Sequence, residues 1–509
     1  MRFNPLLSSR LDDIILKCLE KAADDRFQSA KELAVDLRRL ASPGSAPPKR
    51  ETTPTRQNWL RMTIVAAILF SALALLFAFD VGGLRERIFG RTTGKSIHSL
   101  AVLPMENLSH DLSEEFLADG MTDQVIADLS KIQALRVISR TSVMHYKGTN
   151  KTLPVIADEL NVDAVVEGAV LRSGGRVRVT AQLIQAAGDK PLWTESYERD
   201  MNDVLTLQRD VARDIAQEIK VTLRPAEQAR LAGTRKGNPR AYEAYLKGLY
   251  FWNKWTEEGV RKGIDSFQHA IEIDPEYALA YAGLADAYNA LGDFGMGSVP
   301  PREAAAQAEA AAQKAIALDE GLAEGHAALA MAQFRCDRDW ISVEKEFKRA
   351  LVLNPSYATA HHWYAHYLMA ADRIQEALAE SNRAYDLSPI DPEMGVHLQW
   401  HHFLTGDYDQ VIQQGRKILE FDPTFNEAHL YLGLAYEQKA MYADAIGELE
   451  KAVQLSGGRV IAKSSLGHAY AISGKRDAAL KVLTGLRDSS KQRYISSYDF
   501  AMLDLGLGN

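Results

Sequence analysis

The stretch that decides the fold is residues 426–459, NEAHLYLGLAYEQKAMYADAIGELEKAVQLSGGR, because residues 460–493 repeat its pattern. Four positions of the first copy recur 34 residues later: Leu432, Gly433, Tyr436 and Ala445 return as Leu466, Gly467, Tyr470 and Ala479. Three earlier prolines, Pro355, Pro389 and Pro423, keep the same spacing of 34. A fixed period of this length indicates an array of repeated units, in which each unit buries its apolar face against the next.

The period and the small residues at fixed positions resemble the tetratricopeptide repeat (TPR), a helix-turn-helix unit. Small residues allow close packing of the paired helices, and the prolines end one unit before the next begins. We expect units to start near Ala241, Ala278, Ala323, Ala358, Pro392, Asn426 and Val460, with an eighth near Tyr494 in whose first helix the chain stops. Gln399 replaces the usual small residue in the unit from Pro392. The resemblance implies an α-solenoid over residues 238–509.

TPR solenoids bind segments of other proteins in a concave groove lined by the first helix of each unit. Aromatic and charged residues in such a groove are the types that form binding hot spots. Carrying those positions over predicts a protein-binding groove formed by Asp286, Asn289, Met331, Phe334, His362, His366, Met369, Trp400, Phe403, Leu430, Leu434, Glu437 and His468. Leu430 and Phe403 fit a core role as well as a groove role.

Two of these residues, His362 and His366, lie four apart on one predicted helix face, a spacing that can bind a metal. No glutamate completes an HExxH motif, and three aligned ligands are not evident even with the histidines of the next unit, His397, His401 and His402. We therefore interpret these histidines, together with the adjacent His361, as polar groove residues or as partners in inter-helix hydrogen bonds. We predict no metal, no cofactor and no catalytic residue.

Residues 97–225 carry a different pattern. Strands are expected at 98–104, 135–139, 163–171, 176–184 and 192–197, and helices at 112–132, 153–160 and 204–223. Ser173-Gly174-Gly175 has the composition of a hairpin turn. This order of strands and helices indicates a compact mixed α/β domain.

Short motifs in this block resemble the TolB amino-terminal-like or FlgO-like domain of bacterial envelope and signalling proteins. They are Ala101-Val102-Leu103-Pro104, Ala118-Asp119-Gly120-Met121-Thr122, Val137-Ile138-Ser139-Arg140 and Asp163-Ala164-Val165-Val166-Glu167-Gly168. That family supplies no catalytic set to carry over. We interpret Asp119-Gly120-Met121 as a structural turn within or before a helix.

Residues 62–79, MTIVAAILFSALALLFAF, contain no charge. At about 1.5 Å per residue, this run covers roughly 27 Å, which is near the hydrocarbon thickness of a bilayer. We predict a single transmembrane helix over residues 61–80, preceded by a flexible Pro- and Ser-rich linker over 41–60. Basic residues balance on the two sides, so charge does not set the orientation.

The segments Leu11–Ile15, Lys17–Lys21, Arg26–Ala30 and Asp36–Leu40 resemble the last helices of a bacterial serine/threonine protein kinase domain. The Gly-rich loop, the strand lysine and the catalytic-loop Asp and Asn of that family are absent. Asp293-Phe294-Gly295 spells the kinase metal-binding tripeptide, but no His-Arg-Asp motif precedes it. We interpret residues 1–40 as the remnant of a kinase C-lobe, and we expect the chain to be truncated at both termini.

Composition restricts the function further. The chain has 509 residues, a net charge of -8, 46% hydrophobic and 25% charged residues, which is an ordinary globular balance. A mildly acidic chain is a poor general binder of nucleic acid. Its two cysteines, Cys18 and Cys336, form neither a disulfide framework nor a four-cysteine zinc site.

These observations predict a mainly α chain with a single transmembrane helix, a small mixed α/β domain and a TPR solenoid. We expect a membrane-anchored protein that mediates protein–protein interaction as the sensory or scaffolding part of a bacterial signalling receptor, and no enzyme activity. The resemblance to receptor-like kinases implies the inner membrane, with the N-terminus cytoplasmic and residues 81–509 extracytoplasmic. Two alternatives are a fragment of a transmembrane serine/threonine kinase and a membrane-bound sensor of the transcription-regulator type.

Overall fold

The computed structural model describes residues 97–509 apart from 110, 222, 233–237, 255, 293–298, 337–338, 492–494 and 509. The segments 1–40, 41–60 and 61–80, and the tripeptide Asp293-Phe294-Gly295, lie outside the described residues. The kinase remnant, the linker and the transmembrane helix therefore stay predictions. Among the helices that are described, none combines the length and the hydropathy needed to cross a bilayer.

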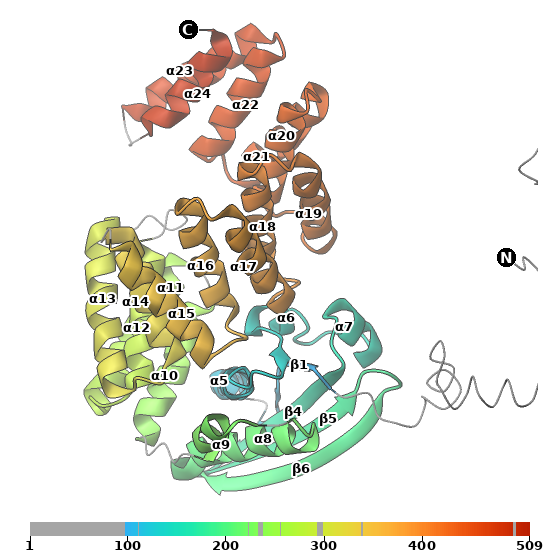
Figure 1. Cartoon of the computed structure of the whole chain (residues 1–509), viewed down its shortest axis with the longest axis vertical. Coiled ribbons are helices and arrows are strands. Elements are labelled where there is room, and N and C mark those ends of the chain that lie inside the picture. The colour runs from blue at the N-terminus through green and yellow to red at the C-terminus, as the bar shows by residue number, and fades with distance from the viewer. Residues whose placement is uncertain are drawn as a thin grey trace, which may run out of the picture. The chain divides into compact units, whose positions relative to one another are not determined.

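The α/β part is built on one mixed sheet of six strands (Figure 1). The strands are β1 (Ser99–Val102), β2 (Glu106–Asn107), β3 (Arg136–Val137), β4 (Ala164–Ser173), β5 (Arg176–Gln185) and β6 (Lys190–Asp200). Their order is β3-β1-β4-β5-β6, with β2 also paired to β4. The pairs of β1 with β3 and of β1 and β2 with β4 are parallel, and the two later pairs are antiparallel. Gly174 has a φ of 60° in the predicted β4–β5 turn, a conformation that favours glycine.

The helices of this part are α5 (Glu115–Leu129), α6 (Arg140–Met144), α7 (Leu153–Glu159), α8 (Val204–Glu218) and α9 (Pro225–Ala232), with short 3-10 turns at Leu112–Glu114 and Met201–Asp203. The five-residue α6 was not predicted, because so short a segment shows no apolar periodicity. Asp119-Gly120-Met121 lies inside α5, so of the two positions that we predicted, within a helix or before one, the structure has the first.

The repeat part consists of helix pairs in succession (Figure 1). The pairs are α10 (Pro239–Trp252) with α11 (Glu257–Ile273), α12 (Ala278–Leu291) with α13 (Pro301–Leu318), α14 (Ala323–Cys336) with α15 (Trp340–Leu353), α16 (Ala358–Ala370) with α17 (Ile374–Leu387), α18 (Pro392–Leu404) with α19 (Tyr408–Phe421), α20 (Asn426–Gln438) with α21 (Tyr442–Leu455) and α22 (Val460–Ile472) with α23 (Arg476–Ser490). A further helix, α24 (Ser497–Leu507), follows them. The predicted TPR-like solenoid of helix-turn-helix units is confirmed.

Small residues at the fixed positions have the expected steric role. A Cβ atom added to Gly433 would lie 2.5 Å from Cγ of Leu449 on the partner helix, and one added to Gly467 would lie 2.4 Å from Cδ2 of Leu503 on α24. Both distances are well below van der Waals contact. Glycine at these positions therefore lets neighbouring helices approach as closely as the repeat requires.

The exception at Gln399 is matched by a glycine on the facing helix. The Gln399 side chain is fully buried on α18, and its Nε2 donates hydrogen bonds to the carbonyls of Val411 (3.1 Å) and Ala428 (3.4 Å). A Cβ atom added to Gly415 on α19 would lie 2.3 Å from Gln399 Nε2. The unit thus holds a large residue on its first helix because its second helix is small there.

We expect Gly415→Ala to lower the free energy of unfolding by about 1–3 kcal/mol through overpacking. Adding Gln399→Ala should relieve part of the clash, so the double variant should lose less stability than the sum of the single variants. Gly447→Ala on α21 is the control, because its added Cβ meets no atom within 4 Å, and it should stabilise the helix by up to about 1 kcal/mol. Denaturant unfolding measures the stability of all four variants. If the effects of Gly415→Ala and Gln399→Ala were strictly additive, the steric match between Gln399 and Gly415 would be contradicted.

The two parts share one continuous hydrophobic core, which the sequence did not predict. The cluster of buried residues that begins at Ile97 in the α/β part runs on through α10, α11 and α12. A Cβ atom added to Gly120 of α5 would lie 2.6 Å from Cδ2 of Leu246 on α10. Close helix contact is therefore the reason for glycine at position 120.

Polar contacts join the same two parts at the turns between repeats. The Ser139 backbone N–H donates to the Leu387 carbonyl (2.7 Å), and its hydroxyl lies 2.6 Å from that of Ser388. The Ser356 hydroxyl donates to the Leu135 carbonyl at 3.2 Å. The α/β part is thus held against the turns that precede α16 and α18, in addition to α10.

Candidate functional site: the first helices of the repeats

All thirteen predicted groove residues lie on the first helices of their units. Asp286 and Asn289 are on α12, Met331 and Phe334 on α14, His362, His366 and Met369 on α16, Trp400 and Phe403 on α18, Leu430, Leu434 and Glu437 on α20, and His468 on α22. We refer to these thirteen side chains as the inner row. Their membership of a binding groove stays a prediction.

The inner row is continuous, because its members contact residues of the next first helix. The Asn289 amide donates to the Ala328 carbonyl on α14 at 3.0 Å. Further along, aromatic rings of consecutive first helices are in contact: the ring centroids are 6.0 Å apart for Phe334 and Tyr367, 5.3 Å for His366 and Trp400, and 6.3 Å for Phe403 and Tyr431. Between the last two first helices, His468 Nδ1 lies 2.9 Å from Glu437 Oε1. The array therefore presents one connected strip of aromatic and polar groups.

The two residues that the sequence left open differ in burial. Leu430 is 7% exposed and belongs to a core cluster with Leu449 and Leu466. Phe403 is half-buried, with its ring centroid 5.7 Å from that of Tyr408. Leu430 is thus a core residue, whereas part of the Phe403 ring stays accessible.

Histidines from two neighbouring units converge at the middle of the inner row. His362 and His366 of α16 have Nε2 atoms 2.7 Å apart. The His397 ring of α18 has its centroid 4.2 Å from that of His362 and 4.8 Å from that of His366. The third imidazole that the sequence did not reveal is thus supplied by the next repeat.

His401 lies behind this group and is fully buried. Its Nε2 is 3.3 Å from His366 Nδ1, and its Nδ1 shares a hydrogen bond with the Ser381 hydroxyl. Burial, reinforced by the neighbouring imidazoles, holds the pKa of His362 and of His366 well below the usual histidine range. Burial also lowers the pKa of His401 to about 3. These three imidazoles are therefore uncharged at neutral pH.

The adjacent His361 has a different role, which recurs in other units. The Nδ1 atoms of His326, His361 and His429 each lie 2.5 Å from a glutamate of the second helix, namely Glu346, Glu380 and Glu448. Their Nε2 atoms lie 3.0 or 3.1 Å from a backbone carbonyl in the turn before the first helix. His361 thus makes the inter-helix hydrogen bond that was one of our two interpretations. Histidine recurs as the fourth residue of α14, α16 and α20, and this recurrence is the signal that reveals the clamp.

Near the start of the inner row, two carboxyl groups are buried in an electrostatically unfavourable environment. Asp286 Oδ1 and Glu324 Oε2 are buried and have no hydrogen-bond partner among the described residues. Burial raises the pKa of Asp286 well above its usual range, and the charge of Glu324 adds to the effect. Near the other end, the hydrogen bond to Glu437 raises the pKa of His468. The inner row thus has a buried acid at one end and a hydrogen-bonded Glu437–His468 pair at the other.

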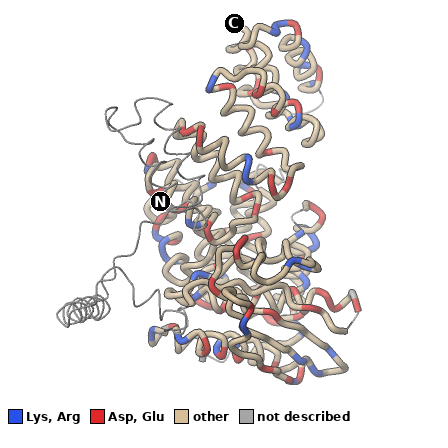
Figure 2. Tube along the Cα trace, turned by 90° about the vertical axis from the view of Figure 1, so that its right-hand side faces the viewer, with Lys and Arg blue, Asp and Glu red and all other residues tan. Residues whose placement is uncertain are grey.

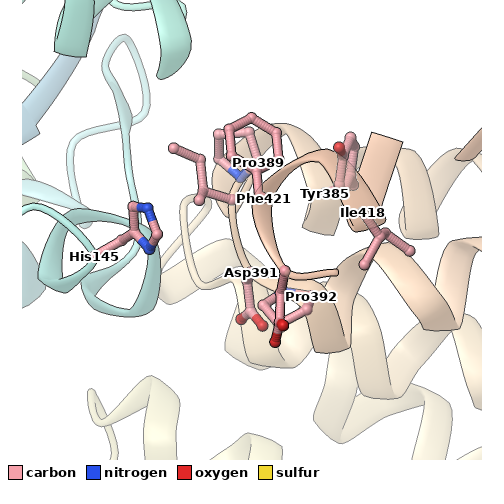
Figure 3. A pocket seen from close by; sticks show the side chains of 9 residues that line it. His145, Tyr385, Pro389, Asp391, Pro392, Ile418 and Phe421 are labelled. Atoms are coloured by element: carbon pink, nitrogen blue, oxygen red, sulfur yellow. The ribbon is translucent and has the colours of Figure 1, made fainter. Parts of the chain in front are cut away.

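A cavity of about 220 Å³ lies where the α/β part meets the repeats (Figure 3). His145, which follows α6, faces a wall made by residues of α17, α18, α19 and the turns between them. The lining residues are His145, Tyr385, Pro389, Ile390, Asp391, Pro392, Ile418, Phe421 and Asp422. None of them was predicted as a site residue, because the cavity forms where the α/β part meets the repeats, and this contact gives no signal in the sequence.

Comparison with known families gives one match, to the model "HilA/YgeH-like transcriptional regulator, second domain", over residues 96–215. This segment is the α/β part. The TolB amino-terminal-like or FlgO-like resemblance stays a prediction, since the matching model bears another name.

Curated proteins of two kinds are among those similar to part of the chain. A protein described as "Putative adenylate cyclase 3" from Rhizobium meliloti is 35% identical over 237 residues, which cover 46% of this chain and 40% of the relative. The transcriptional regulator HilA from Salmonella typhimurium is 21% identical over 324 residues, which cover 63% of this chain and 56% of the relative. The chain thus spans about half the length of these relatives. Among solved structures, YrrB, a TPR protein with an unusual peptide-binding site, has a TM-score of 0.29 and 22% identity, covering 38% of this chain and 95% of that protein.

Proposed function

We propose that this protein is a membrane-anchored TPR-type protein that binds another protein along its inner row and serves as the sensory or scaffolding part of a signalling receptor, without catalysis of its own. The observation that carries the proposal is the contact between side chains of consecutive first helices from α14 to α22. Half-buried aromatic rings such as Phe334, Trp400 and Phe403 supply contact area, as binding hot spots do.

The relatives support a regulatory module. One is named as a cyclase and the other as a transcription regulator, so similar sequence accompanies two different outputs. A regulatory module that binds a signal or a partner, and that is joined to different output domains in different proteins, accounts for both. In this proposal residues 61–80 contact the lipid bilayer of the inner membrane, the N-terminus is cytoplasmic and residues 81–509 are extracytoplasmic.

A second candidate is a membrane-bound sensor of the transcription-regulator type, and the match of residues 96–215 to a HilA-like second domain favours it. Acidic and basic residues are interspersed along the described trace (Figure 2), which suits a protein partner better than the dense basic face that nucleic acid needs. DNA retained specifically by the full chain would favour the regulator. ATP-dependent phosphorylation by the full chain would instead support the kinase-fragment alternative.

We expect the double variant Trp400→Ala/Phe403→Ala to lose its bound partner, because two accessible aromatic anchors are removed. A hot-spot aromatic is worth about 2 kcal/mol or more, which is about thirtyfold in affinity for one residue, so the double variant should bind its partner at least about thirtyfold more weakly. The measurement is cross-linking of the full chain in its native membrane, followed by quantification of the proteins captured with wild type and variant.

Ile341→Ala is the matched control, because Ile341 lies on the second helix α15 and is 83% exposed. It should retain the same partners as wild type. Circular dichroism checks that both variants stay folded. Equal capture by all three proteins, or equal loss in both variants, would remove the inner row as the binding surface.

A further inference from the structure

We propose that His362, His366 and His397 form a binding site for a divalent transition-metal ion, of the class of Zn²⁺, that bridges two neighbouring repeats. One ring nitrogen from each of the three side chains lies within 4.8 Å of the other two. Two of the histidines come from α16 and one from α18, so the site exists only when the two units are stacked. The proposal does not depend on the partner proposed above.

The donor set fits such an ion. Imidazole nitrogen is a preferred ligand of Zn²⁺, Cu²⁺ and Ni²⁺, whereas Mg²⁺ and Ca²⁺ prefer oxygen. His362 and His366 have the i, i+4 spacing that places two imidazoles on one helix face. Three protein ligands leave one tetrahedral position for water or for another donor. Glu393 Oε2, one helical turn before His397, lies 3.9 Å from His397 Nε2 and is near enough to approach that position.

The three rings must adjust, because their ligand nitrogens lie up to 4.8 Å apart. Nitrogens bound to one tetrahedral zinc at 2.0–2.1 Å are about 3.3 Å from one another. The Nε2 atoms of His362 and His366 are 2.7 Å apart, so an ion between them replaces their hydrogen bond and separates the rings by roughly half an ångström. The His397 ring has its centroid within 5 Å of both other rings.

A second layer of side chains orients the ligands, as is usual around protein-bound metals. His401 Nε2 lies 3.3 Å from His366 Nδ1, which leaves the Nε2 of His366 directed at His362. The Ser381 hydroxyl in turn bonds His401 Nδ1. The Trp400 ring lies 5.3 Å from the His366 ring and covers one side. Arg335 places a positive charge near His366, and its Nη1 donates to the Asn289 carbonyl.

Isothermal titration of the full chain with ZnCl₂, in detergent and without a histidine tag, should show one saturable site. His397→Ala and His362→Ala should each weaken binding by more than tenfold, and His401→Gln should weaken it less. His269→Ala is the control, because that side chain is 64% exposed on α11, and it should bind as wild type does. Unchanged affinity in both ligand variants would overturn the site.

A measurement on the unmodified chain keeps the test independent of variant folding. X-ray absorption at the zinc edge should show about three nitrogen neighbours at 2.0–2.1 Å, and Co²⁺ should give the absorption bands of a tetrahedral complex. Because the ion joins two repeats, Zn²⁺ should also raise the midpoint of thermal unfolding, and a chelator should reverse the increase. No saturable binding, or coordination by oxygen alone, would show that the histidines are only a hydrogen-bonded cluster.

Discussion

Leu246→Ala is expected to destabilise both the α/β part and the first repeats, by about 2–5 kcal/mol. Leu246 is fully buried on α10 and lies against Gly120 of α5, across the boundary between the two parts. Truncation leaves a cavity in the hydrophobic core that both parts share. Because the two parts are stabilised by the same contacts, amides of α5 should exchange their hydrogens faster than in wild type, together with amides of α10 and α11.

Leu449→Ala provides a matched control with the same chemistry. Leu449 is also fully buried and also lies against a glycine of a neighbouring helix, Gly433. Its cluster contains residues of α20, α21 and α22 alone. Hydrogen exchange should therefore accelerate in those helices and stay unchanged in α5. If the amides of α5 stayed protected from exchange in Leu246→Ala, the α/β part would be stable without the repeats. The shared core would then not couple the stabilities of the two parts.

The repeat helices were predictable from the sequence because the period is a local property. Each first helix needs a small residue where its partner crosses, and that requirement repeats every 34 residues whatever the rest of the chain does. The starts at Ala358 and Asn426 therefore agree with the structure to the residue. Strands β4 and β5 were predictable for a similar reason, since alternation and a Gly-containing turn define a hairpin.

The boundary between the two parts was not predictable in the same way. It depends on hydroxyl and backbone groups such as Ser139 and Ser388, which lie 249 positions apart. Serines have no periodic pattern, and a backbone carbonyl is present at every residue, so neither gives a signal in one sequence. The approach of His397 to His362 was not predicted for the same reason, because it depends on how two units stack.

Asp391→Asn is expected to remove the part of the pH dependence of stability that comes from Asp391. Asp391 is 6% exposed, and its side chain accepts hydrogen bonds from the Glu393 backbone N–H (3.0 Å) and the Ser388 hydroxyl (3.2 Å) at the start of α18. Burial raises the pKa of Asp391 from 3.8 to about 6, although these hydrogen bonds oppose the shift. Between pH 4 and pH 6 the folded chain thus keeps a proton that the unfolded chain releases.

The sign follows from proton linkage. Because the folded state binds more protons in this window, the free energy of unfolding falls as pH rises from 4 to above 6. A shift of about two units corresponds to about 3 kcal/mol. Asparagine caps a helix as well as aspartate does and does not titrate, so Asp391→Asn should be the more stable protein at pH 7 and should lose that advantage near pH 4.

Denaturant unfolding of both proteins at pH 4, 5, 6 and 7 measures the difference directly, and the contributions of all other titrating groups cancel in it. Asp407→Asn is the control, because Asp407 also caps a helix, at α19, but its side chain is 51% exposed. That variant makes the same change at an exposed helix cap, so its effect on the free energy of unfolding should be much smaller. A wild-type-to-Asp391→Asn difference that stays constant with pH would mean that Asp391 is charged in the folded chain. The turn between α17 and α18 would then hold a buried negative charge beside the α/β part, where neutral hydroxyls now make the contact.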